Sequence, residues 1–200
     1  MPRRCGHEVT VRRPLTELPK GLPRPIDDGA ASHLQGMSLP DLALRATDGT
    51  MVNIGAIAGR VVIYVYPMTA RPGVPVPEGW GRIPGARGCT PQSCAFRDHY
   101  AELRSLKTAV FGLSTQATDY QKEARDRLHL PFDLLSDSEH RLKQLLRLPT
   151  FQVAGMELYK RLSLIAEDGK IRKVFYPVFP PDRNAAEVFA WLRQCDRVHP

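Results

Sequence analysis

The spacing of hydrophobic positions changes along the chain, and it predicts an initial hairpin followed by a buried strand. Residues 42, 44 and 46 are apolar and alternate with other residues, the turn signal Asp48-Gly49 follows, and residues 51–54 can return as a second strand. Residues 61–66 read Val-Val-Ile-Tyr-Val-Tyr and end at Pro67. A continuous apolar run of this length is typical of a strand buried on both faces.

Downstream of this strand, helical and strand spacings alternate. Phe96, Tyr100, Leu103 and Leu106 follow helical spacing. The other expected elements are strands at residues 110–113 and 132–135, helices at 119–128 and 139–148, a hairpin of residues 162–166 and 171–176 about Asp168-Gly169, and a last helix over residues 185–192 with Asp182 as its N-cap. This order favours an α/β fold, a mixed sheet with helices on both faces and an N-terminal hairpin.

The prolines divide the chain. Six of the 18 lie within residues 1–40 and six more between Pro67 and Pro91. We therefore expect residues 1–36 to be a Pro-rich N-terminal extension and residues 37–200 to be one domain. Residues 68–88 would be a long inserted loop of that domain. The carboxyl ends of the strands carry the chemistry in open α/β sheets, and the loop after Tyr66 leaves from such an end.

Composition and charge exclude several classes of protein. The net charge is +7, but the Lys and Arg residues are scattered, so nucleic-acid binding is not expected. No run of 18 apolar residues predicts a membrane span, and no apolar segment follows the arginines of residues 1–13, so a secretory signal is not expected. A cytoplasmic protein is therefore expected, in which four cysteines are reactive, ligating or buried rather than paired in structural disulfides.

The strongest candidate for chemistry is the pair Cys89 and Cys94, where the long loop enters a helix. Thr90 and Pro91 are both helix-start signals, which places Cys89 at or beside a helix N-terminus. The unpaired N–H groups and the positive end of the helix dipole favour a thiolate there, and a thiolate attacks an O–O bond. Two alternatives stay open: an inert buried cysteine, and a zinc site with His99, although no second ligand pair has suitable spacing.

Other residues could complete such a site. Arg161 precedes the apolar strand at 162–165 and could supply a positive partner for the thiolate, although an arginine at such a position is more often solvated. Thr69, three residues after Tyr66, is a candidate hydroxyl donor at the same edge of the sheet. Cys5 and Cys195, at the two ends of the chain, are interpreted as incidental.

Residues 88–98, which read Gly-Cys-Thr-Pro-Gln-Ser-Cys-Ala-Phe-Arg-Asp, resemble the signature of the Q-type peroxiredoxins, the bacterioferritin-comigratory-protein class. Four further segments match that class in order, and the resemblance covers residues from about 37 to 195. The segments are residues 39–42, 64–67, 130–137, and 161–165 with the turn at 168–171.

The resemblance implies a thioredoxin-like (peroxiredoxin) fold and the reduction of hydrogen peroxide or organic hydroperoxides. Cys89 would be the peroxidatic cysteine and Cys94 the resolving cysteine, and thioredoxin or a similar dithiol protein would reduce their disulfide. Arg161 matches the arginine that holds the peroxide and the thiolate. No metal, haem or flavin cofactor is implied, and we expect a monomer or a weak homodimer.

The sequence departs from the family pattern just before Cys89. The family has Thr or Ser three residues before the peroxidatic cysteine and Pro four residues earlier, where this chain has Ala86 and Arg82. An insertion of roughly fifteen residues also separates Pro67 from Cys89. Thr69 is our candidate for the missing hydroxyl.

Two further hypotheses stay open, the first of them because of this departure. One is a redox sensor or thiol–disulfide exchange module without efficient peroxide turnover. The other is a thioredoxin-like interaction protein whose inserted loop binds a partner through an exposed Trp80.

Overall fold

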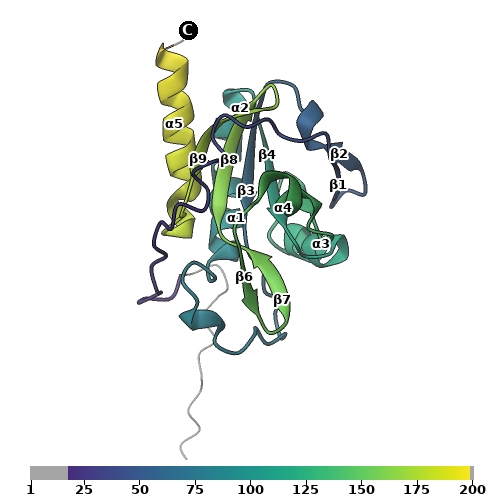
Figure 1. Cartoon of the computed structure of the whole chain (residues 1–200), viewed down its shortest axis with the longest axis vertical. Coiled ribbons are helices and arrows are strands. Elements are labelled where there is room, and N and C mark those ends of the chain that lie inside the picture. The colour runs from purple at the N-terminus through teal and green to yellow at the C-terminus, as the bar shows by residue number, and fades with distance from the viewer. Residues whose placement is uncertain (1–17, 199–200) are drawn as a thin grey trace, which may run out of the picture.

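Seven strands form one mixed sheet in the computed structural model, which describes residues 18–198 (Figure 1). Their order is β2-β1-β5-β4-β3-β8-β9; β3, β4 and β5 run parallel, and the other pairs are antiparallel. The strands are β1 (Ala43–Ala46), β2 (Met51–Asn53), β3 (Arg60–Val65), β4 (Thr108–Ser114), β5 (Leu134–Ser136), β8 (Leu162–Glu167) and β9 (Lys170–Phe175). The predicted α/β fold and the initial hairpin are confirmed.

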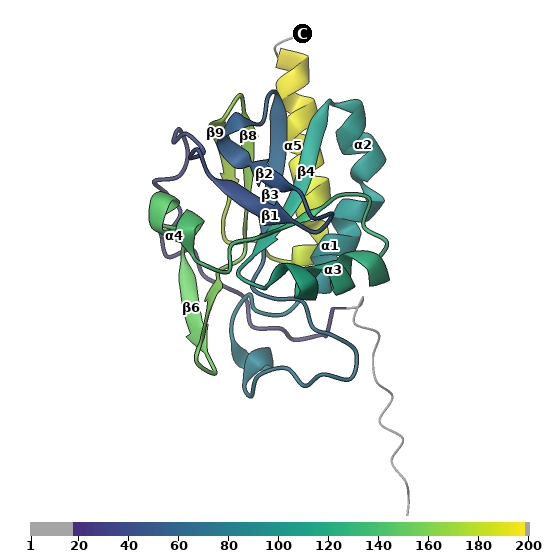
Figure 2. The same ribbon diagram turned by 90° about the vertical axis from the view of Figure 1, so that its right-hand side faces the viewer.

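Helices lie on both faces of this sheet, as Figure 2 shows for α4 on one side and α5 on the other. The helices are α1 (Cys89–Asp98), α2 (Tyr100–Ser105), α3 (Thr118–Arg127), α4 (Arg141–Leu146) and α5 (Asn184–Val198), and the 3-10 turns are η1 (Ile54–Ala56), η2 (Trp80–Arg82) and η3 (Pro181–Arg183). None of the described helices is long and apolar enough to cross a membrane.

The buried strand β3 supplies both halves of the core because side chains alternate along a strand. Residues 61, 63 and 65 pack in a cluster that includes Leu142 and Leu146 of α4. Residues 62, 64 and 66 pack in a second cluster, with Phe96 of α1 and Val188 of α5. The second cluster also contains Cys89 and Cys94, so the predicted reactive segment is built against the central strand.

Two helix predictions were wrong in detail. The helical spacing from Phe96 to Leu106 belongs to two helices, because the chain leaves helical geometry at His99 (φ −95°, ψ 5°). The last helix begins at Asn184, and Asp182 is not its N-cap because it lies inside the 3-10 turn η3. Pro180 precedes that turn.

The inserted loop is anchored by a hairpin that the sequence did not predict. Strands β6 (Thr150–Val153) and β7 (Met156–Tyr159) pair outside the main sheet, about the turn Ala154-Gly155. Trp80 packs beside Phe151 of β6, and Leu158 of β7 lies in the same apolar cluster. The interaction hypothesis predicted that Trp80 is exposed, and this prediction is wrong because Trp80 is only 5% exposed.

The described part of the extension packs on the domain. Ala31 and Leu34 are buried in the cluster that contains the odd-numbered residues of β3. The backbone N–H of Gly36 donates to Ile171 of β9. The domain core thus includes side chains that precede residue 37.

Candidate active site

Cys89 is the first residue of α1, as the sequence predicted. The residue before it, Gly88, has a left-handed backbone (φ 101°), and a Cβ there would lie only 2.3 Å from the Cγ of Pro181. Glycine is therefore required at this entry. Thr90 lies inside the helix and does not cap it. Pro91 lies in the first turn, where a missing N–H costs nothing.

The side chain of Arg161 reaches the sulfur of Cys89 from the residue that precedes β8. Its Nη2 donates to Sγ over 3.1 Å, and both residues are buried, with 3% and 4% exposure. Within residues 18–198 Arg161 forms no ion pair with a carboxylate. A buried cation needs compensation, and a negative charge on Sγ would supply it. The predicted pairing of Arg161 with Cys89 is present.

The loop before α1 fixes the guanidinium of Arg161. Nε and Nη2 donate to the carbonyl oxygen of Gly85 over 3.3 and 3.2 Å, and Nη2 also lies 3.2 Å from the carbonyl oxygens of Ala86 and Arg87. Three consecutive carbonyl groups thus hold one side of the group. The orientation of Arg161 toward Sγ therefore depends on residues 85–87.

A buried amide network, missed by the sequence analysis, holds the other side of the guanidinium. Arg161 Nη1 donates to Gln92 Oε1, Gln92 Nε2 donates to Asn184 Oδ1 over 2.9 Å, and Ser163 Oγ donates to the same oxygen over 2.6 Å. Arg161 can only donate, so it fixes the orientation of both amides and the direction of every hydrogen bond. Gln92, Asn184 and Ser163 are each 0% exposed. The sequence signal that could have revealed this network was Gln92, because it lies three residues after Cys89 and therefore on the same side of the helix.

The position of the family hydroxyl is occupied by an apolar side chain. Ala86 is 0% exposed and belongs to the cluster around Trp80. Its carbonyl oxygen lies 3.6 Å from Cys89 Sγ. Thr69 is buried, and its hydroxyl donates to Gln116 Oε1 over 3.1 Å. No hydrogen bond within residues 18–198 joins Thr69 to Cys89 or Arg161.

Cys94 lies in the same helix and is 8% exposed. Burial raises the pKa of its thiol, and the nearby Arg97 partly opposes this. Two Cα atoms five residues apart on a helix are about 8.6 Å apart, whereas a disulfide tolerates only about 7 Å. The thiols of Cys89 and Cys94 are free here. Their disulfide would require α1 to unwind.

The sequence profile of the redoxin family matches residues 34–189, about the whole sheet and its helices. This chain belongs to the redoxin family. Its relatives in that family are peroxiredoxins of the Q type. The peroxiredoxin Q, chloroplastic, of Oryza sativa subsp. japonica is 28% identical over 160 residues, 80% of this chain and 66% of the rice protein. Peroxiredoxin bcp1 of Schizosaccharomyces pombe is 32% identical over 119 residues, 58% of this chain and 53% of that protein.

Solved structures give the same fold for this redoxin. The peroxidoxin BcpB of Mycobacterium tuberculosis superposes with a TM-score of 0.65 at 24% identity, covering 80% of this chain and 96% of that one. The bacterioferritin comigratory protein of Xanthomonas campestris, which has alkyl peroxide reduction activity, gives 0.63 at 19% identity, over 80% and 97% of the two chains. The thioredoxin-like fold predicted from the sequence is thereby confirmed.

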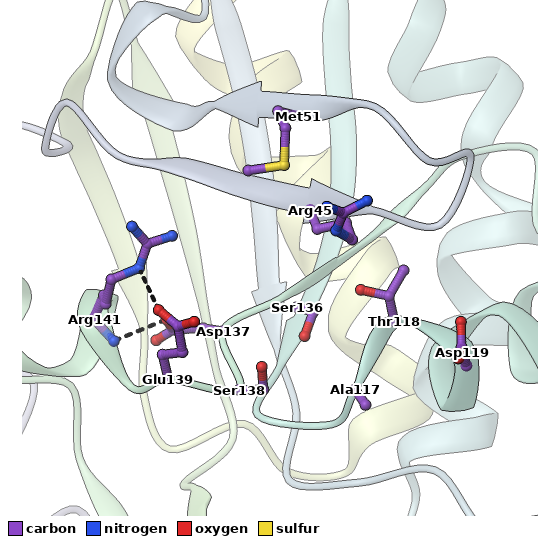
Figure 3. A pocket seen from close by; sticks show the side chains of 10 residues that line it. All are labelled: Arg45, Met51, Ala117, Thr118, Asp119, Ser136, Asp137, Ser138, Glu139 and Arg141. Carbon is purple, nitrogen blue, oxygen red and sulfur yellow. Dashed lines mark hydrogen bonds and ion pairs between the residues drawn. The ribbon is translucent and has the colours of Figure 1, made fainter.

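Two cavities of the redoxin lie away from the Cys89–Arg161 pair. One, of about 430 Å³, is polar and lies between the β1–β2 hairpin and the starts of α3 and α4 (Figure 3). There the carboxylate of Asp137 accepts from the backbone N–H groups of Arg141 and Leu142, so it caps α4. The other, of about 660 Å³, is mainly apolar and lies between the inserted loop and the β6–β7 hairpin. Neither is lined by Cys89, Cys94 or Arg161.

The side chains that could ligate a metal ion do not cluster in the described part of the redoxin. Within residues 18–198 no three His, Cys, Asp or Glu side chains come together as a metal site would require. His99 Nδ1 lies 3.0 Å from the carbonyl oxygen of Ala95, one turn earlier in α1. Cys195 is half-buried on α5. Cys5 lies outside the described residues.

Proposed function

We propose that the protein is a thiol peroxidase that reduces hydrogen peroxide or organic hydroperoxides through Cys89. The observation that carries this proposal is the 3.1 Å contact between Arg161 Nη2 and Cys89 Sγ at the first turn of α1. A cation and a helix N-terminus beside one sulfur favour a nucleophilic thiolate. Membership of the redoxin family, with peroxiredoxins among the relatives, supports peroxide as the substrate of this thiolate.

The proposed reaction has two steps in this chain. The Cys89 thiolate attacks one oxygen of the hydroperoxide, the O–O bond breaks, and the second oxygen leaves as an alkoxide or hydroxide that takes up a proton. The sulfur is thereby oxidised to a sulfenic acid. The Cys94 thiol then attacks this sulfur, forming the Cys89–Cys94 disulfide and releasing water. Arg161 would stabilise the negative charge in the first step.

A dithiol protein completes the proposed cycle. Thioredoxin or a similar protein would reduce the disulfide by exchange and regenerate both thiols. We place this cycle in the cytoplasm and expect a monomer or a weak homodimer. The relatives from Oryza sativa subsp. japonica and Suaeda salsa are named chloroplastic, so the compartment of these two proteins differs from the one that we propose here.

Thr69 remains our candidate to replace the missing hydroxyl. Its Oγ1 already donates to Gln116 Oε1, so it could only accept a hydrogen bond from the O–H of the hydroperoxide. The isosteric Thr69→Val variant tests this proposal. We expect slower oxidation of Cys89, and equal second-order rates for the two proteins would remove Thr69 from the site.

A second candidate function is a redox sensor that shares the fold but turns over slowly. The apolar Ala86 at the hydroxyl position favours it. Stopped-flow measurement of thiol loss with hydrogen peroxide separates the two functions. An enzyme loses the first thiol rapidly and then the second, whereas loss on the timescale of free cysteine would favour the sensor. Cys89→Ser should abolish turnover while the fold persists, and normal catalysis by this variant would refute the assignment of Cys89 as the nucleophile.

A further inference from the structure

The N-terminal extension lies against the loop that leads into Cys89. A Cβ on Gly88 would lie 2.9 Å from the Cδ2 of Leu18, and a Cβ on Gly85 would lie 3.6 Å from the ring of Pro25. Figure 2 shows the start of the described chain passing below the first turn of α1. The extension therefore covers both ends of loop 85–88.

Loop 85–88 is the segment that orients Arg161. The carbonyl oxygens of residues 85, 86 and 87 accept hydrogen bonds from its guanidinium, and that group in turn contacts Cys89 Sγ. Pro25 thus packs on one of the residues that hold the cation against the sulfur, and Leu18 packs on Gly88, between those residues and Cys89. Neither residue touches the sulfur itself, so their action would be indirect.

A third contact fixes the extension beside Arg161. The carboxylate of Asp28 accepts from the Nζ of Lys160, the residue before Arg161, and from the hydroxyl of Tyr176 over 2.7 Å. These two hydrogen bonds, that from Lys160 above all, lower the pKa of Asp28 well below its usual range. The two charged side chains are 42% and 36% exposed. Exposed ion pairs contribute little free energy, so this anchor can be released.

We propose that residues 18–28 act as a strap, with Leu18, Pro25 and Asp28 as its contacts, that positions Arg161 for the attack on peroxide and opposes the unwinding of α1. This inference rests on the proposed peroxidase function. The attack needs loop 85–88 and Arg161 in place. Disulfide formation needs the first turns of α1 to unwind, because the helical spacing keeps the two cysteines apart, and loop 85–88 leads directly into these turns. The strap favours the first step and slows the second.

The test measures the two steps separately by stopped flow in the full-length chain with hydrogen peroxide. In Leu18→Ala we expect slower loss of the first thiol and faster disulfide formation, each by about three- to tenfold, the effect of losing one or two partly buried methyl groups. Asp28→Asn should likewise slow the loss of the first thiol and speed disulfide formation, each by about twofold, because an exposed ion pair is weak.

The same segment offers two matched controls. Ile26 is 85% exposed, so Ile26→Ala removes an apolar side chain that covers nothing. Asp27 accepts from the backbone N–H of Gly29 in a local turn, so Asp27→Asn removes a neighbouring charge without touching Lys160. Both controls should match the parent in both steps.

A second readout does not depend on peroxide. Lys20 is exposed in the strap, and trypsin should cut after it faster once diamide has formed the Cys89–Cys94 disulfide than in the reduced protein. Equal cleavage in the two states, or variants in which both steps change in the same direction or not at all, would overturn the strap. A parent protein that does not consume peroxide would instead overturn the proposed function, and the cleavage rates of the diamide-oxidised protein would still decide on the strap.

Discussion

Gln92 Nε2 donates to Asn184 Oδ1 over 2.9 Å and so connects the first turn of α1 to the first residue of α5. Gln92 also lies between the two cysteines in the sequence, and its other amide atom accepts from Arg161. One side chain thus joins the guanidinium, the helix that must unwind and the helix packed beside it. Unwinding of the first turn of α1 displaces Gln92 and so acts against both of its hydrogen bonds.

Replacing Gln92 with alanine should weaken both the site and the fold. Asn184 and Arg161 would each lose a buried partner, and a buried group left unsatisfied costs about 1–3 kcal/mol. We expect the free energy of unfolding to fall by that amount and the oxidation of Cys89 to slow. Urea unfolding and stopped-flow oxidation measure the two effects. Gln152→Ala, at an exposed position of β6, should change neither; a Gln92→Ala protein as stable and as fast as the parent would show that the network is dispensable.

Arg161→Ala should slow the oxidation of Cys89 by about ten- to a hundredfold, the equivalent of one charged hydrogen bond of about 1.5–3 kcal/mol. Arg161→Lys should restore little, because an ammonium group cannot reach Sγ, three carbonyl groups and Gln92 together. Second-order rate constants with hydrogen peroxide measure the effect. Arg104→Ala, at an exposed site on α2, is the matched control. Rates within twofold of the parent for Arg161→Ala would remove this residue from the catalytic site.

The elements nearest the site were the most predictable from the sequence. The apolar run 61–66 indicated a strand buried on both faces, and Thr90 and Pro91 indicated a helix start at or beside Cys89. The contact of Arg161 with Cys89 joins residues 72 apart in the chain. The position of Arg161 before the strand 162–165 made it a candidate partner of Cys89, and the family resemblance supported the same pairing.

The missed features depend on contacts between distant segments. The two strands of the β6–β7 hairpin are only four residues long, and their apolar positions are covered because Trp80 of the inserted loop packs against them. Likewise, Gln92, Ser163 and Asn184 look like ordinary polar residues in the sequence. Their burial becomes apparent only when α1, β8 and α5 are packed together.

The thiol of Cys94 should make the reduced protein less stable at alkaline pH. Burial raises its pKa in the folded state, so the folded protein holds this proton more tightly than the unfolded chain, where the pKa is about 8.5. This contribution is complete below the unfolded value and is lost as the pH rises through the folded value. Urea unfolding under reducing conditions at about pH 7 and about pH 9.5, roughly 1.5 units below and 1 unit above the unfolded value, should show the decrease. Cys94→Ser should show a smaller one, and an equal decrease in both proteins would contradict this account.

The last prediction concerns α1 itself, in which residues 89–98 are continuously helical in the reduced protein. The disulfide cannot bridge an intact helix, since the two Cα atoms would be about 8.6 Å apart, beyond the limit of about 7 Å. Oxidation should therefore unwind α1 from Cys89 to about Ala95 and release Phe96, whose ring stacks on Tyr64 with centroids 4.4 Å apart. Opening one short segment is compatible with an otherwise folded protein.

Hydrogen exchange on the reduced and disulfide forms tests this unwinding. We expect amide protection of residues 92–98 to fall on oxidation, while protection of β3 and β4, at the centre of the sheet, stays the same. Cys94→Ser treated with peroxide is the control: it can form the sulfenic acid but no bond to residue 94, so its α1 should stay protected. If residues 92–98 are equally protected in both forms of the parent protein, no unwinding occurs. Cys94 would then not be the resolving cysteine, because no other movement within α1 brings its sulfur to Cys89.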